Sequence, residues 1–374
     1  MSLGALTINL LISLYCALSI LRNYQYPKYI SGLNILLLLF TIYGFCFIFF
    51  GQSVAINLPT TGLIYVKNYS YLKGIYISLL PIYAFYYFTE KGFLTESKIR
   101  KWTVIFFLCA LYMYFKILSE TIESFGAADE EVQNNGGYLF LSMLPLLVFF
   151  NKRPVVMLIL LTLFESFIII SAKRGAILIG VIVLLFIIWK MESIIGSQYR
   201  KLKFFFIITI LIAVYFFTWS FLEEDSLLYM RFEDTLEGRT SGRDILYTVF
   251  SNYFLFDTNA WQFIVGSGAW STLRIQGQFA HSDWLEIAVN QGCTGLIVYM
   301  IYWWFFIITC YKSYRDDYIS IGIVMVAFIF FLESIFSMSY SDMTIYSTIV
   351  LGFCLAKLYP QQKKEVKTIN FVKP

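Results

Sequence analysis

The chain has 374 residues, of which 59% are hydrophobic, 20% aromatic and only 14% charged, with a net charge of +4. Soluble globular chains carry about 25% charged residues, so this composition argues against a soluble protein. Apolar runs of about 20 residues, the length that crosses the hydrocarbon of a bilayer, recur from end to end. A β-barrel would instead show short segments of alternating polarity. The composition therefore predicts an all-α polytopic integral membrane protein.

About eleven membrane spans are predicted in chain order. They lie at residues 5–21, 30–50, 72–89, 102–118, 137–150, 154–171, 175–190, 204–220, 284–310, 318–336 and 343–357. The fifth is short enough to be tilted or partly re-entrant. The first is not expected to be a cleaved signal peptide, because it lacks a basic n-region and a small-x-small cleavage site.

Basic residues are divided unequally between the two sides of these spans. One set of alternate loops, together with the C-terminal tail, holds 19 of the 28 Lys and Arg residues. Cytoplasmic loops are enriched in these residues, so the N-terminus is predicted outside and the C-terminus inside. The chain is then organised as spans 1–8 (residues 1–220), a large periplasmic loop (221–283), spans 9–11 (284–357) and a cytoplasmic tail (358–374).

A tight outward turn, Ser171-Ala172-Lys173-Arg174-Gly175, joins two apolar helices. It places two cations at the N-terminus of the following helix, where exposed N–H groups and the helix dipole add positive potential. Lipid phosphate or pyrophosphate would lie at that depth, and a guanidinium group binds phosphate oxygens in bidentate fashion. The same residues are equally consistent with an interfacial anchor.

Three further arginines, Arg231, Arg239 and Arg243, cluster in the large loop. Neighbouring acidic residues can pair with the first two on a solvated surface. Arg243 begins a stretch over 244–265 with scattered apolar and aromatic residues, which predicts one or two helices lying at the interface. Arg243 is therefore the better candidate to face inward, and Gly266-Ser267-Gly268 is expected to end the stretch.

His281 is the single histidine of the chain. Asp283 and Glu286 have the spacing of a capping box, which predicts a helix beginning at Asp283. The helix dipole would disfavour the imidazolium form just before that N-terminus, and a neutral imidazole is the usual general base near neutral pH. A lone histidine is by itself more often a polar loop residue. One histidine, and cysteines without metal spacing, also argue against a metal site.

Charged residues also fall within predicted spans, and charges in hydrocarbon usually face a partner or a water-filled cavity. Lys116 is expected to pair with Glu165 or Glu333. A proton-coupled transporter would use similar residues, so these charges do not decide the function.

Three stretches together resemble the O-antigen polymerase and ligase family, which comprises Wzy-type polymerases and their lipid A-core ligase relatives. They are Ser171-Ala-Lys-Arg174-Gly-Ala, Ser241-Gly-Arg243-Asp, and Gly266-Ser-Gly268 followed by His281-Ser-Asp-Trp-Leu285-Glu286 and Gln291-Gly292-Cys-Thr-Gly295-Leu. The resemblance covers roughly residues 171–296. The chain departs from the family pattern at Ser282, where asparagine is usual.

The resemblance implies a GT-C-like membrane glycosyltransferase of lipopolysaccharide or capsular polysaccharide biosynthesis, with its active site on the periplasmic face of the bacterial inner membrane. The donor would be a glycan on undecaprenyl pyrophosphate, and the acceptor a lipid-linked repeat unit. Arg174 and Arg243 would bind the pyrophosphate, and His281 would be the acceptor base. Substrate-binding roles are expected for a wider set: Lys173, Arg239, Asp283, Glu286, Gly266 and Gly268.

The remaining expected partners are membrane lipids and a chain-length regulator protein. Neither a cofactor, a metal nor a nucleic acid is expected. Direct attack by the acceptor hydroxyl would invert the anomeric carbon, with the leaving pyrophosphate stabilised by the two guanidinium groups.

Other functions remain open from the sequence. An O-antigen ligase would move the same donor onto lipid A-core with the same three residues. A lipid-linked oligosaccharide flippase or another transporter would place its charges along the spans and would not need His281. In a structural or sensory membrane protein, Arg174, Arg243 and His281 need not converge on one cavity.

Overall fold

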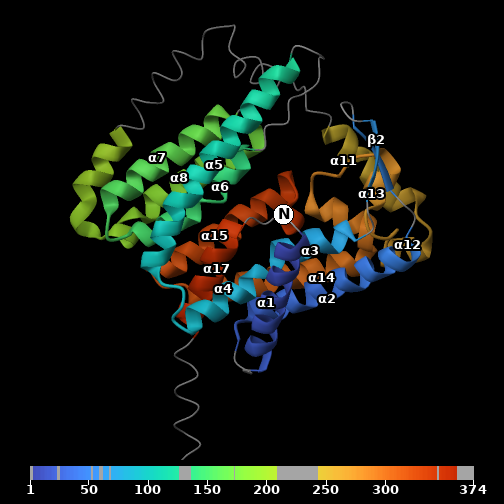
Figure 1. Ribbon diagram of the computed structural model, residues 1–374, viewed down its shortest axis with the longest axis horizontal. Helices are drawn as coiled ribbons and strands as arrows, with labels where there is room; N and C mark the ends of the chain where they lie inside the picture. Colours follow the sequence, from blue (N-terminus) through green and yellow to red (C-terminus); the bar gives the residue numbers. More distant parts are fainter. Residues whose placement is uncertain are drawn as a thin grey trace, which may run out of the picture. The chain divides into compact units, whose positions relative to one another are not determined.

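The computed structural model describes residues 3–22, 26–51, 54–58, 62–66, 69–125, 136–171, 173–208, 243–342 and 345–359 (Figure 1). The chain divides into two compact units. The first comprises Met1–Lys91, Ser241–Tyr314 and Phe330–Pro374, and the second comprises Gly92–Thr240 and Arg315–Ile329. Each unit combines segments that are distant in the sequence.

The first unit is mainly helical. Its elements are α1 (Leu3–Arg22), α2 (Lys28–Phe50), strands β1 (Val54–Leu58) and β2 (Gly62–Val66), α3 (Ser70–Leu79), α4 (Pro81–Glu90), α11 (Arg243–Asn252), the π-helix η3 (Tyr253–Asp257), α12 (Ala260–Val265), α13 (Ser271–Gln276), α14 (Asp283–Ser313), α16 (Ser339–Asp342) and α17 (Ile345–Leu358). The antiparallel hairpin β1–β2 pairs Val54 with Val66 and is a departure from the all-α expectation.

Helices α2 and α14 pack against each other in opposite directions. The backbone N–H of Tyr29, at the start of α2, donates to Thr309 Oγ1 near the end of α14 at 2.9 Å. A Cβ atom built on Gly32 would lie 3.1 Å from the Cα atom of Tyr302, so the absence of a side chain at Gly32 lets the two backbones approach closely. The remaining elements of the first unit include the helices that carry the candidate site.

Proline interrupts the third predicted span. Residues 72–89 form two ten-residue helices, α3 and α4, because Pro81 stands at the first position of α4. Proline lacks a backbone N–H donor and is favoured at this helical position.

The second unit contains α5 (Glu96–Phe125), α6 (Gly136–Leu141), the 3-10 helix η1 (Leu144–Phe150), α7 (Pro154–Ile170), α8 (Arg174–Ile195), η2 (Ser197–Tyr199) and a helical segment over 200–208. Helix α15 (Tyr318–Phe336) begins in this unit and ends in the first. Aromatic rings fill the core between α5, α6 and α7, where Phe140 and Phe167 stack at 4.8 Å. The fifth predicted span is the broken pair α6 and η1, in keeping with its expected irregularity.

One of the expected intramembrane pairs is not formed. Glu165 is buried in α7, and its Oε1 has no hydrogen-bond partner among the described residues. Lys116 on α5 is exposed, and no ion pair joins it to Glu165. Glu165 instead lies against α8, where Gly180 leaves room for the carboxylate. The alternative pairing of Lys116 with Glu333 stays a prediction.

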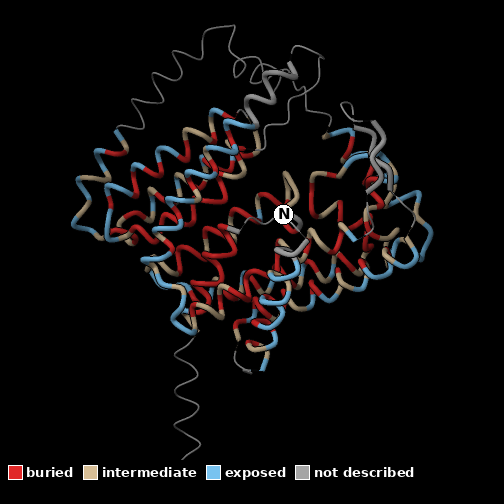
Figure 2. Tube along the Cα trace, viewed as in Figure 1, coloured by how far each residue is buried: buried red, intermediate tan, exposed pale blue. Residues whose placement is uncertain are grey.

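Within the described residues, four helices are long and apolar enough to cross a membrane: α2, α8, α14 and α15. Shorter apolar helices lie at Thr7–Arg22, Gly136–Phe150, Pro154–Ile170 and Tyr346–Leu358. Exposed positions recur along these helices, as Figure 2 shows, and many of them carry large apolar residues such as Leu38, Leu185 and Trp304. The helical, membrane-embedded character is thus supported, whereas the count of eleven spans stays a prediction. Most of the eighth predicted span and the first part of the large loop lie outside the described residues.

Candidate functional site

Helix α11 carries Arg243 as its first residue and packs onto the beginning of α14. Its apolar side chains Leu246 and Phe250 are buried against Ala280 and Val289. Burial of this apolar surface holds the whole helix in place. The side of α11 that bears Arg243 is thereby positioned relative to the loop that contains His281.

Arg243 contacts the end of helix α15. Its Nη1 donates a hydrogen bond of 2.8 Å to the carbonyl oxygen of Phe336, the last residue of that helix. A cation is stabilised there by the negative end of the helix dipole. This bond uses one of the five guanidinium N–H donors, so it fixes the guanidinium group through Nη1.

Tyr247 lies one helical turn after Arg243 and brings the same side of α11 to His281. Its hydroxyl lies 3.2 Å from the carbonyl oxygen of His281 and 3.2 Å from that of Ile335, so it donates to one or the other. Burial raises the pKa of Tyr247, and Arg243 partly offsets this rise. The hydroxyl is therefore a stable donor, and Arg243 and His281 are held on the same side of α11.

His281 adopts a backbone conformation that is uncommon for a residue with a side chain. Its φ is +52°, in the left-handed region. The neighbouring residues hold it there: the N–H of Ala280 donates to Glu286 at 3.0 Å, and Tyr247 contacts the carbonyl of His281. Such conformations cost about 1–3 kcal/mol and cluster at functional sites.

Asp283 is fully buried at the first position of α14. Its Oδ2 accepts hydrogen bonds from the hydroxyl of Tyr299 at 2.7 Å, from the N–H of Tyr340 at 3.3 Å and from the hydroxyl of Ser339. Its Oδ1 accepts from the N–H of Ser339 at 2.9 Å. The carboxyl group therefore ties the beginning of α14 to α16, a positioning contact, and its predicted substrate-binding role is untested.

Glu286 is also fully buried, and its donors come from three segments. Oε1 accepts from Thr272 Oγ1 at 2.5 Å and from Asn290 Nδ2 at 2.9 Å, and Oε2 accepts from the N–H of Ala280. The helix begins at Asp283 as predicted, but the capping box is not formed: its N-cap, Ser282, makes no side-chain capping bond. Asp283 accepts from Ser339 instead, and Glu286 accepts from Thr272, Asn290 and Ala280.

Two glycine motifs that are separated in the sequence meet at a break in α14. Gly292 has φ +65° and ψ −161°, so the helix is interrupted there. The N–H groups of Ser267 and Gly268 donate to the carbonyls of Val289 and Asn290 at 2.9 and 3.0 Å. A Cβ atom on Gly266 would lie 2.3 Å from the Asn290 carbonyl oxygen. The N–H groups of Ser267 and Gly268 thus have their acceptors within the chain.

Arg274 on α13 supports the same glycine turn, and sequence reasoning did not select it. Its Nη2 donates to the carbonyl of Ser267 and to the hydroxyl of Ser271. Partial burial lowers the pKa of Arg274, and Tyr253 opposes the change. Its one sequence signal was its place among the basic residues on the side predicted to face outward.

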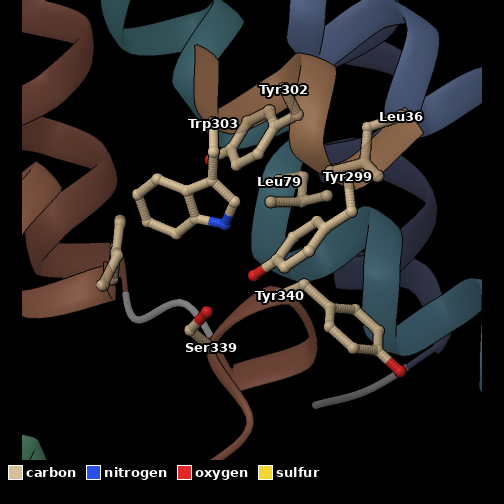
Figure 3. Close-up of a pocket in the computed structure, with 8 residues that line it drawn as sticks. Leu36, Leu79, Tyr299, Tyr302, Trp303, Ser339 and Tyr340 are labelled. Carbon is tan, nitrogen blue, oxygen red and sulfur yellow. The ribbon is translucent and has the colours of Figure 1, made fainter. Parts of the chain in front are cut away.

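A small cavity lies beside the partners of Asp283, as Figure 3 shows. Its volume is about 10 Å³, and it is lined by side chains of α2, α3, α14 and α16 together with Phe330. Tyr299 and Ser339, which both donate to Asp283, stand on its wall. A cavity of this size holds about one water molecule, so it is too small to be a sugar-binding site.

The remaining predicted site residues lie elsewhere in the chain. Arg174 is the first residue of α8 in the second unit, and Lys173 is the N-cap of that helix. Both side chains are half-buried. The convergence of Arg174 with Arg243 and His281 stays a prediction, and Arg239 lies outside the described residues.

No protein-family model matches the chain, and no curated protein sequence is significantly similar to it. The resemblance to O-antigen polymerases therefore rests on the motifs alone.

Proposed function

We propose that the chain is a membrane glycosyltransferase that polymerises undecaprenyl-pyrophosphate-linked oligosaccharide repeat units at the outer face of the bacterial inner membrane. One observation carries the proposal. Helix α11 presents Arg243 and, one turn later, a tyrosine whose hydroxyl contacts the backbone of His281. A cation suited to pyrophosphate and the single imidazole of the chain therefore belong to one local arrangement.

The proposed reaction is a direct displacement at the anomeric carbon of the donor. His281 accepts the proton of the acceptor hydroxyl, whose oxygen forms the new glycosidic bond. The bond between the anomeric carbon and the pyrophosphate oxygen breaks, and the leaving group takes the electron pair. Arg243, joined by Arg174, stabilises the negative charge that develops there. The configuration at the anomeric carbon is inverted.

The backbone of the His281 loop supports this role, because a general base must be held in place to be effective. The left-handed conformation at His281 is fixed from two sides. Glu286, fully buried, binds the N–H of the preceding residue, and Tyr247 contacts the carbonyl of His281.

The test is polymer formation by the purified full-length protein in liposomes with synthetic lipid-linked repeat units. His281→Asn removes the base but keeps a residue that tolerates a left-handed backbone, and His281→Ala is the companion variant. Gln278→Ala, at an exposed position of the same loop, is the matched control. We expect a ladder of polymer from the wild type and the control and none from either His281 variant.

Other outcomes would redirect the assignment. An undiminished ladder from both His281 variants would remove the general-base role. A wild-type protein that makes no ladder but transfers glycan to added lipid A-core would be a ligase. Movement of labelled repeat units across the bilayer without any transfer would identify a flippase.

A further inference from the structure

The segment that joins α11 to the glycine turn, residues 253–265, exposes a row of large apolar side chains. The exposed fractions are 58% for Leu255, 77% for Phe256, 71% for Trp261 and 51% for Ile264. Asp257 is the single charged residue of the segment. An apolar surface of this kind on a folded protein marks a contact with another molecule or with lipid.

The contacts of α2 and α14 set a scale for the depth of this segment. Tyr29 of α2 and Thr309 of α14 lie at one level, because they share a hydrogen bond. Tyr43 follows Tyr29 by 14 residues, about 21 Å along a helix that rises 1.5 Å per residue. Thr294 precedes Thr309 by 15 residues, about 22 Å along α14.

Both of these positions touch the end of α12. The hydroxyl of Tyr43 donates to the carbonyl of Val265, and the hydroxyl of Thr294 donates to the carbonyl of Ile264 at 2.9 Å. Two independent counts thus place the end of α12 about 22 Å from the level of Tyr29. Figure 1 shows α12 beside α2 and α14.

With the beginning of α2 taken as one boundary of the hydrocarbon core, this depth falls inside the bilayer. The hydrocarbon core is about 30 Å thick, and Lys28 stands at the beginning of α2, next to the reference level. A span starting there reaches the opposite boundary only beyond the end of α12. Tilt of the spans moves α12 further from the boundary opposite Lys28, because a tilted helix rises less along the bilayer normal.

The exposed surface of the two spans at this level is also apolar. Ile42 and Phe45 of α2 are 51% and 50% exposed, and Ile297 and Met300 of α14 are 53% and 51% exposed. The apolar row on residues 253–265 therefore continues a surface of the kind that faces lipid.

Backbone donors at both ends of α12 are satisfied within the protein, as this depth requires. Non-helical backbone within a membrane must be satisfied by the protein itself. The side chains of Asn259 and Gln262 form a capping box at the start of α12. At its other end, Gly266 donates to the carbonyl of Gln262, and the next two N–H groups donate to α14.

We infer that residues 253–265 form a re-entrant element seated in the leaflet opposite Lys28, with Leu255, Phe256, Trp261 and Ile264 against lipid acyl chains. The element anchors the loop that carries Arg243 and His281 to the membrane surface. The inference depends on the fold of the first unit and not on the proposed enzyme activity.

The test places a nitroxide spin label at Ile264→Cys or Trp261→Cys in the full-length protein, reconstituted in liposomes, with its six native cysteines replaced. Gln278→Cys is the matched control, since it is exposed and belongs to the loop before α14. Collision rates are measured with oxygen, which concentrates in hydrocarbon, and with a water-soluble nickel chelate. All three positions are exposed, so the substitutions should not disturb the fold.

We expect oxygen collisions to exceed nickel collisions at Ile264→Cys and Trp261→Cys, and the order to be reversed at Gln278→Cys. Nickel accessibility at residues 261 and 264 equal to that of the control would overturn the inference, because the segment would then stand in water. Labels shielded from both reagents would overturn it as well, since another protein surface would then cover the row.

Discussion

The meeting of the two glycine motifs makes Gly292→Ala an informative perturbation. Gly292 has φ +65° and ψ −161°, a region that is essentially restricted to glycine and that costs about 1–3 kcal/mol for other residues. The new Cβ atom would also lie 2.4 Å from the backbone nitrogen of Gly266 and 2.7 Å from the Ile264 carbonyl. Backbone atoms cannot rotate away, so the glycine turn must shift.

The free energy that keeps the glycine turn packed against α14 is therefore expected to fall by at least about 2 kcal/mol. This corresponds to about a 30-fold increase in the equilibrium constant for local opening of the contact. Hydrogen exchange measures it directly, because opening of the contact exposes the N–H groups of Ser267 and Gly268. Peptides covering residues 266–270 should exchange about 30-fold faster in Gly292→Ala than in the wild type.

Gly74→Ala is the control for this experiment. Gly74 lies in α3, and a Cβ atom there would meet nothing within 4 Å. Alanine is favoured over glycine in a helix by about 1 kcal/mol, so this variant should leave exchange at residues 266–270 unchanged. Equal protection of these residues in Gly292→Ala and Gly74→Ala would refute the packing of one motif against the other.

Three further predictions follow from the same geometry and from the sequence. Tyr247→Phe removes the hydroxyl beside His281, and it should lower polymer formation in the liposome assay at a stability cost of about 1 kcal/mol in thermal unfolding; wild-type turnover would show that this contact does not position the base. Arg174→Lys keeps the charge but loses bidentate binding of phosphate, so the amount of polymer should fall strongly while the protein remains in the membrane. Full polymer length from both Arg174→Lys and Arg174→Ala would instead make the residue an interfacial anchor. A reporter fused after Lys203 should be cytoplasmic and one inserted near Gly238 extracytoplasmic; both reporters on one side would contradict the span order.

Much of the helical framework was predictable because it depends on local composition. The apolar runs at 30–50, 154–171 and 318–336 coincide with α2, α7 and α15 to within a few residues. The break at Pro81 is also a local effect, and the sequence contained its signal. The β1–β2 hairpin was not predicted, although two short runs rich in Val, Ile and Tyr on either side of a Pro- and Gly-containing segment are a hairpin signal.

The candidate site was predictable in part. Its single histidine and the arginine at the start of α11 stand out by residue type in an apolar chain, as do the two glycine motifs. The prediction that a helix begins at Asp283 is also confirmed. The role of Tyr247 was not predicted, because one tyrosine among 28 does not stand out by residue type.

By itself, the sequence determined that the chain is helical and apolar enough for a membrane, and which rare residue types stand beside its helix ends. Only the tertiary structure decided what those residues touch. Asp283 takes its donors from Ser339, 56 positions away, and from Tyr340, instead of forming the local capping box that its spacing with Glu286 predicts. Helix formation follows from neighbours along the chain, but a buried carboxyl group must bind whichever donors the packed helices bring within hydrogen-bonding distance.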